Sequence, residues 1–129
     1  VALDFTKQAG IRSVNFHDPA LITAFVNDFG GEYWLSKACE MHVDQVDLVI
    51  FISVSGESPN LVNAARDLAI RDIETISFTG KFQDNKLGIE TNMNFWVDSH
   101  AYNIVECIHM IWLTSVIDMI IGKSEYTVS

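Results

Sequence analysis

Three serines and a glycine follow an apolar run closely, and their spacing could hold an anion. Ser53, Ser55 and Ser58 supply hydroxyl donors, and Gly56 permits a backbone conformation or a close approach that a side chain would block. Pro59 opens a helical pattern with Ser58 as its N-cap, and the first N–H groups of a helix are unpaired donors that attract phosphate. Strand-to-helix turns without a ligand use the same residues, so the residues alone leave both interpretations open.

A glutamate and a histidine in the last apolar segment are the candidates for proton transfer. At about 100° per residue of helix, Glu106 and His109 lie within one arc of about 60°. A carboxylate and an imidazole placed in this way could act as base and acid. The alternative is structural: the two side chains satisfy each other, or a subunit contact, on an otherwise apolar helix.

The sequence predicts neither a metal nor a cofactor. His17 and His42 have no ligand partner at a useful spacing, and Cys39 and Cys107 form no C-x-x-C pair. Both cysteines lie in apolar helical patterns, so we expect buried thiols rather than a disulfide.

The composition indicates one folded domain, spanning residues 1–129, and its charge argues against two classes of partner. Hydrophobic residues make up 49% of the 129 residues and charged residues 19%, which excludes a disordered chain. The net charge of −9, from 17 acidic and 8 basic residues, argues against nucleic acid or an anionic membrane as a partner. A phosphate held by backbone N–H groups and hydroxyls remains compatible with this charge.

Strand and helix patterns alternate along the chain. They predict strands over 11–16, 47–52, 73–78 and 94–97, helices over 1–9, 18–26, 32–42, 59–71 and 100–122, a loop or short exposed helix over 81–90, and a polar tail after Gly122. This alternation predicts a parallel sheet in a three-layer α/β/α sandwich, with ligands beyond the carboxyl ends of the strands. The continuous apolar strand 47–52 should be covered on both faces, and the helix that starts at Asp18 should bury one face.

The apolar segment 101–121 approaches the length of a membrane span. It carries Asn103, Glu106, His109 and Asp118, which would be costly in lipid, so we expect a core or interface helix and no membrane partner. A helix that is apolar most of the way round needs cover on more than one side. A preceding helix or another subunit would supply that cover, and we expect a homo-oligomer, a dimer or a tetramer.

Two motifs resemble a known family. The string Ser53-x-Ser55-Gly56-Glu57-Ser58 after an apolar strand resembles the phosphosugar signature of the sugar isomerase (SIS) domain family. Residues 21–30, LITAFVNDFG, resemble a segment of its phosphoheptose isomerase branch, and residues 76–80 are similar to a strand end of that branch. The resemblance runs over residues 11–121.

The resemblance implies a fold, an activity and site residues. It implies a five-stranded parallel sandwich, a cytoplasmic homotetramer and the isomerisation of a phosphorylated ketose such as sedoheptulose 7-phosphate. The hydroxyls of Ser53, Ser55 and Ser58 would hold the sugar phosphate, with Asp28 at the site. Compared with the family, this chain has Val54 in place of a threonine.

Two larger departures leave two functions open. A first helix and strand, and a helix with a catalytic glutamate, are absent from this chain, so we expect it to be N-terminally incomplete. The glutamine and histidine of the family's last helix correspond to Val105 and Leu113 here. The first hypothesis is an aldose–ketose isomerase that moves a proton between neighbouring carbons. The alternative is a non-catalytic SIS module that binds a sugar phosphate or sugar nucleotide as a regulator or assembly partner.

Overall fold

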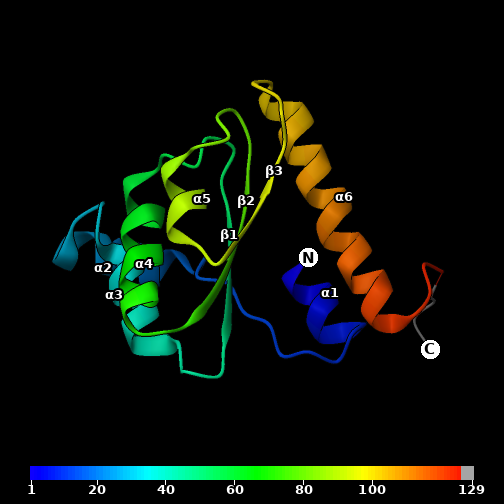
Figure 1. The fold of residues 1–129 in the computed structure, drawn as a ribbon. Helices are drawn as coiled ribbons and strands as arrows, with labels where there is room; N and C mark the ends of the chain where they lie inside the picture. The colour runs from blue at the N-terminus through cyan, green and yellow to red at the C-terminus, as the bar shows by residue number, and fades with distance from the viewer. Residues whose placement is uncertain (126–129) are drawn as a thin grey trace.

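The chain folds into three layers in the computed structural model, which describes residues 1–125 (Figure 1). A parallel sheet of three strands separates helices α2 to α5 on one side from α1 and α6 on the other. The elements in chain order are α1 (Ala2–Lys7), α2 (Pro19–Phe29), α3 (Trp34–His42), β1 (Leu48–Ile52), α4 (Pro59–Ile70), β2 (Glu74–Thr79), α5 (Lys86–Glu90), β3 (Met93–Trp96) and α6 (Tyr102–Ile121). The predicted fold class, a parallel three-layer α/β/α sandwich, is confirmed, although residues 1–125 form three strands rather than the five that the resemblance implies.

The strands lie in chain order, β1-β2-β3, with both pairs parallel. Ile52 is in register with Phe78, and Phe78 with Phe95, so the carboxyl ends of all three strands meet at one edge. α4 and α5 make the two crossovers on the same face of the sheet (Figure 1). Loops that follow β1, β2 and β3 therefore gather at this edge.

The strand predicted over 11–16 is wrong. These residues are irregular, and no strand among residues 1–125 pairs with them. Ile11 and Val14 are exposed, whereas Phe16 packs against the core and the ring of His42. The segment does contain apolar and β-branched side chains, but an extended segment needs a neighbouring strand to become part of a sheet.

Both predicted proline helix starts are confirmed. Asp18 caps α2, because its carboxylate accepts hydrogen bonds from the N–H groups of Ala20 and Leu21 at 2.8 and 3.1 Å. Ser58 is the N-cap of α4, with Pro59 at the first helical position. The residues around the serine loop thus adopt the strand, turn and helix that the sequence indicated.

A tight core lies between the sheet and α3 and α4. Its fully buried members include Ala64, Ala65, Leu68 and Leu87, each at 0% exposure. Small alanine side chains let the helices approach each other and the strands closely. Leu87 belongs to α5, so the segment 81–90 does form a short helix, although one that is anchored rather than exposed throughout.

Two burial predictions are wrong on the sides away from this core. The apolar face of α2 holds no buried residue, since this helix packs mainly against α3. In β1, Phe51 is buried toward α3 and α4, but Leu48 and Ile52 on the other face remain 52% and 51% exposed. α6 contacts β2 and leaves that face of β1 open.

α6 packs on the sheet through one stripe. Val105, His109, Leu113 and Ile117 recur every four residues and are the buried residues of this helix. By length and composition α6 could also cross a membrane, and 22% of its most apolar window is buried. Cys107 lies outside the stripe and is exposed, which corrects the prediction of two buried thiols, while Cys39 is buried as expected. The polar tail after Gly122 lies outside the described residues from position 126 onward.

Candidate functional site

The serine loop, residues 53–58, is fixed to the carboxyl edge of the sheet. The N–H of Ser53 donates to the carbonyl of Phe78 at 3.0 Å, which extends the β1–β2 ladder by one residue. The N–H of Gly80 donates to the carbonyl of Val54, also at 3.0 Å. The loop therefore lies where the ends of β1 and β2 meet, as the sequence predicted.

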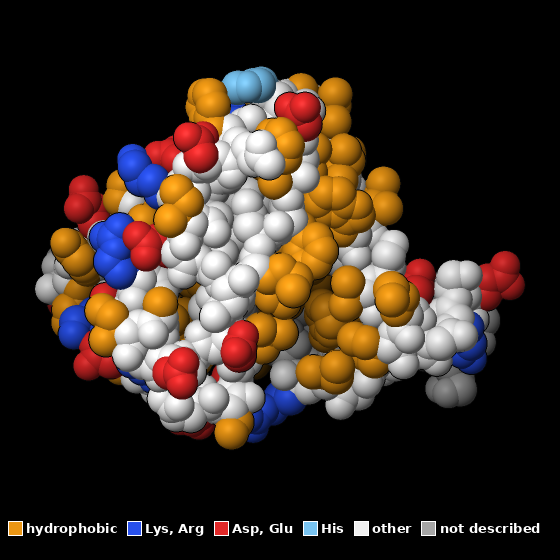
Figure 2. All heavy atoms as spheres, viewed as in Figure 1, with side chains coloured by type: hydrophobic (Ala, Val, Ile, Leu, Met, Phe, Trp, Pro, Cys, Tyr) orange, Lys and Arg blue, Asp and Glu red, His pale blue; other side chains and the backbone are white. Residues whose placement is uncertain are grey.

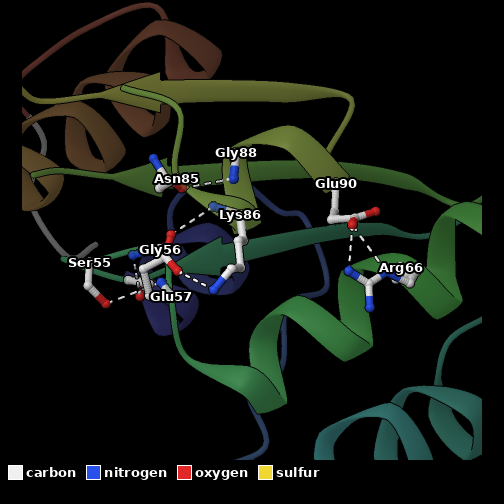
Figure 3. Close-up of polar contacts among 9 residues, drawn as sticks. Ser55, Gly56, Glu57, Arg66, Asn85, Lys86, Gly88 and Glu90 are labelled. Atoms are coloured by element: carbon white, nitrogen blue, oxygen red, sulfur yellow. Dashed lines mark hydrogen bonds and ion pairs between the residues drawn. The ribbon is translucent and has the colours of Figure 1, made fainter. Parts of the chain in front are cut away.

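Inside the loop, serine hydroxyls accept hydrogen bonds from backbone N–H groups. The N–H of Gly56 donates to Oγ of Ser53 at 3.1 Å, and the N–H of Glu57 donates to Oγ of Ser55 at 3.2 Å (Figure 3). Each of these hydroxyls keeps its own proton, which no hydrogen bond within residues 1–125 uses. A hydroxyl that accepts from an amide is polarised to donate more strongly.

Ser58 completes the set at the start of α4. Its side chain makes no capping hydrogen bond to the helix, although it occupies the N-cap position, and it is half-buried. Leu61 and Val62 donate their N–H groups to the backbone carbonyl of Ser58 at 3.1 Å instead. No hydrogen bond within residues 1–125 uses the hydroxyl of Ser58, so it can donate its proton to a ligand at the positive end of the helix.

Gly56 is required by geometry. Its φ is +65°, in the left-handed region that favours glycine, and a Cβ at this position would lie 2.0 Å from Oδ1 of Asn85. The carbonyl of Gly56 also accepts from the N–H of Leu87 at 2.9 Å. The turn of the loop is therefore held against the start of α5, and no other residue type would fit there.

Asn85 is the part of this site that the sequence prediction missed. Its side chain is 1% exposed, accepts from the N–H of Gly88 and donates to Oγ1 of Thr79 and the carbonyl of Phe82. Thr79 in turn donates to the amide oxygen of Asn94 on β3 at 2.8 Å. An asparagine is a common N-cap, as Asn85 is for α5, but nothing local indicates that it supports a loop 29 residues earlier.

Glu57 faces α5 and is held by Lys86. One carboxylate oxygen accepts from the backbone N–H of Lys86 at 3.0 Å, and the other pairs with its ammonium at 2.8 Å (Figure 3). The side-chain hydrogen bond from Lys86, with the backbone one, lowers the pKa of the Glu57 carboxyl below its ordinary value. The loop thus carries one negative charge, paired with one cation.

Asp28, predicted at the site from the resemblance, lies near the end of α2. Its carboxylate is exposed and accepts a hydrogen bond from the side chain of Asn27 at 3.0 Å. Within residues 1–125, no hydrogen bond or ion pair joins Asp28 to the serine loop.

The two candidates for proton transfer have different surroundings. Glu106 is exposed, and His109 is 2% exposed on the buried stripe of α6. Nε2 of His109 lies 3.0 Å from the carbonyl of Thr79, so this nitrogen carries the proton and donates it. Its Nδ1 is buried with no partner in the described part of the chain. The structure therefore does not pair His109 with Glu106.

Val105 and Leu113 share the buried stripe with His109, at 0% and 3% exposure. The methyl groups of Val105 lie against Gly80, where an added Cβ would come within 2.8 Å of them. These two positions therefore contribute to packing between α6 and the sheet. Over residues 1–125, no group of histidine, cysteine and acidic side chains could hold a metal ion.

A parallel α/β sandwich with a hydroxyl-rich loop between a strand end and a helix start defines an α/β domain that can bind a small anion. Comparison with protein families is more specific, because the family model of the SIS domain matches residues 20–114. This chain belongs to the SIS domain family.

Curated proteins that are similar in sequence to this chain include phosphoheptose isomerases. That of Fusobacterium nucleatum subsp. nucleatum is 30% identical over 112 residues, which cover 87% of this chain and 57% of the relative. That of Glaesserella parasuis serovar 5 is 32% identical over 75 residues, covering 58% and 39% of the two chains. This chain therefore spans little more than half the length of the Fusobacterium relative.

Two solved phosphoheptose isomerases share the fold. The structure from Francisella tularensis superposes with a TM-score of 0.76 at 23% identity, covering 84% of this chain and 58% of that one. The structure from Neisseria gonorrhoeae gives a TM-score of 0.79 at 22% identity, covering 92% and 67%. Both support the parallel sandwich arrangement of the described elements.

Proposed function

We propose that this protein binds a phosphorylated sugar at the serine loop and interconverts its aldose and ketose forms, as a phosphoheptose isomerase-like enzyme. The observation that carries the proposal is the set of three hydroxyls, of Ser53, Ser55 and Ser58, at the start of α4. Two of them are polarised by loop amides, and all three keep a proton to donate. The similarity to phosphoheptose isomerases indicates a phosphorylated heptose such as sedoheptulose 7-phosphate as substrate.

A phosphate cradle supplies binding and orientation, while isomerisation also needs an acid and a base. Glu106, His109 and Asp28 remain our candidates for this part. His109 bonds the carbonyl of Thr79, next to Gly80, whose N–H holds the loop at Val54. This chain of contacts brings the imidazole close to the loop end of the sheet. Glu106 would act from the exposed side of α6.

The alternative, a non-catalytic SIS module, is favoured by one specific observation. Val105 and Leu113, which the resemblance aligns with a glutamine and a histidine, are apolar and buried between α6 and the sheet. A module of this kind would bind a sugar phosphate or a sugar nucleotide without converting it.

Turnover separates the two functions. The protein is incubated with sedoheptulose 7-phosphate and related ketose phosphates, and aldose formation is followed by NMR. The isomerase predicts aldose signals that grow with enzyme concentration, and Glu106→Gln should reduce the rate while Asp118→Asn, on the same helix, leaves it unchanged. Saturable binding with no turnover at high protein concentration would establish the alternative instead.

We further propose a cytoplasmic homo-oligomer, a dimer or tetramer, assembled through α6 and the open face of the sheet. Hydrophobic side chains gather where β3, α6 and α1 lie (Figure 2). A groove of about 230 Å³ on this side is lined by Phe78, Phe95, Trp112, Ser115, Val116 and Met119. Covering such a surface is favourable in water. Light scattering should give a mass above that of one chain, and a monomer at high concentration would contradict the assembly.

A further inference from the structure

We propose that Lys86 raises the affinity of the serine loop for a phosphate dianion, by holding the carboxylate of Glu57 against α5. This inference rests on the proposed function, because it assumes that the loop binds phosphate. It adds a residue from outside the serine motif, 29 positions further along the chain than Glu57. Lys86 is here a positioning residue that acts through Glu57.

The charge of the loop poses the problem that Lys86 would solve. Glu57 is the one ionisable residue among positions 53–58, and its carboxylate is negative where an anion is expected to bind. A free carboxylate beside a phosphate dianion would repel it by Coulomb interaction. A loop of this sequence therefore needs its own charge neutralised or turned away before it can bind phosphate well.

The geometry supplies both effects. Each carboxylate oxygen of Glu57 has its own partner on Lys86, the backbone N–H at 3.0 Å and the ammonium at 2.8 Å. The side chain of Glu57 is thus fixed on the α5 side of the loop, whereas the hydroxyl of Ser55 hydrogen-bonds, within residues 1–125, only with the backbone N–H of Glu57, at 3.2 Å (Figure 3). The carboxylate is committed to α5, and the serine hydroxyls remain available.

No other ion pair among residues 1–125 involves the loop. Arg66 pairs with Glu90 and Lys37 with Glu40, both away from the serines. The Glu57–Lys86 pair is itself partly solvated, with side-chain exposures of 38% and 67%. Exposed pairs contribute little to folding stability, so the effect of Lys86 should appear in anion affinity rather than in the stability of the fold.

Calorimetric titration with inorganic phosphate and with sedoheptulose 7-phosphate, at pH 8 and low salt, tests the inference. Lys86→Met should weaken the binding of both ligands by about tenfold, and added salt should narrow this difference. Glu57→Gln should bind at least as well as the unsubstituted protein. The affinity of the Glu57→Gln, Lys86→Met double variant should lie within about twofold of that of the unsubstituted protein, because the repelling carboxylate is gone. The matched control is Lys37→Met, which removes an equal charge from the Lys37–Glu40 ion pair on α3.

The outcomes distinguish this inference from the proposed function. Binding by the unsubstituted protein with unchanged affinity in Lys86→Met would overturn the role of Lys86 alone. If Glu57→Gln weakened binding as much as Lys86→Met and the double variant did not recover, the pair would be a structural brace, and the inference would also fail. No saturable binding of either ligand by the unsubstituted protein would overturn the proposed function and this inference together.

Discussion

The two faces of the sheet differ in how completely this chain covers them. Toward α3, α4 and α5, side chains such as Leu68 and Leu87 are fully buried, and polar groups such as Asn85 find partners. Toward α6, Leu48 and Met93 remain about half exposed at 52% and 53%. The serine loop is supported by the covered face. The covered face therefore provides most of the support of the serine loop, and the open face is the one through which we propose assembly.

The largest expected change in the free energy of unfolding comes from truncating a buried side chain on the covered face. Leu68→Ala removes a fully buried side chain and should lower the free energy of unfolding by about 3 kcal/mol. Met93→Ala, on the open face at 53% exposure, should lower it by about 1 kcal/mol. Urea denaturation of both variants measures the difference. Equal losses at a protein concentration low enough to dissociate the proposed oligomer would show that a single chain covers this face as well, and the two faces would then not differ.

The next effect tests how the covered face holds the serine loop. Gly56→Ala must place a Cβ 2.0 Å from Oδ1 of Asn85 in addition to keeping a left-handed backbone. Gly10→Ala is the matched control, because its φ of +68° is similar and nothing lies within 4 Å of its Cβ position. We expect about 1 kcal/mol of destabilisation for Gly10→Ala and at least about 2 kcal/mol for Gly56→Ala. Similar losses in thermal unfolding would mean that Asn85 does not constrain the loop.

Chemical modification of the two cysteines is the mildest test of the difference between the two faces. Cys39, packed in the covered core, has a pKa raised to about 11, first of all by burial, whereas Cys107 on α6 is exposed. At pH 8, a thiol of that pKa is about one part in a thousand thiolate, which is the reactive form. A maleimide should therefore modify Cys107 readily and Cys39 only after unfolding, as peptide mass spectrometry would show. Rapid labelling of Cys39 would contradict a closed core.

The pKa of Cys39 also sets a direction for stability against pH. Because the folded value lies above the ordinary value of 9.0, the unfolded chain loses this proton first as the pH rises. The contribution of the protonated Cys39 thiol to the free energy of unfolding is therefore fully present below about pH 9 and is lost as the pH approaches 11. The free energy of unfolding of Cys39→Ala should therefore fall less steeply between pH 9 and 11 than that of the unsubstituted protein.

Local patterns in the sequence were sufficient for the elements of the covered face. Pro59 after Ser58 marked the start of α4, and the apolar run before Ser53 marked β1, because capping and strand burial act over a few residues. The strand predicted over residues 11–16 does not form, because a strand needs a neighbouring strand and no such neighbour lies among residues 1–125. The same dependence on neighbours explains why Leu48 is exposed although its strand is wholly apolar.

The support of the candidate site was beyond local patterns. Asn85 meets Gly56, and Lys86 meets Glu57, each across 29 residues, and only the crossover through α4 and β2 brings them together. The place of the serines between β1 and α4 was predictable, because a strand end, a turn and a helix cap lie within one short segment. His109 was singled out by its type and spacing, but its bond to Thr79 depends on the packing of α6.

Phosphate binding by the serine loop is the central property that we propose for this protein. Calorimetric titration of the Ser55→Ala, Ser58→Ala double variant with a sugar phosphate tests it, with Ser115→Ala on α6 as control and circular dichroism to verify folding. We expect the double variant to lose about 2 kcal/mol or more of binding free energy, because two hydrogen bonds to an anion are removed, and the control to bind normally. Unchanged affinity in a folded double variant would contradict the assignment of the site.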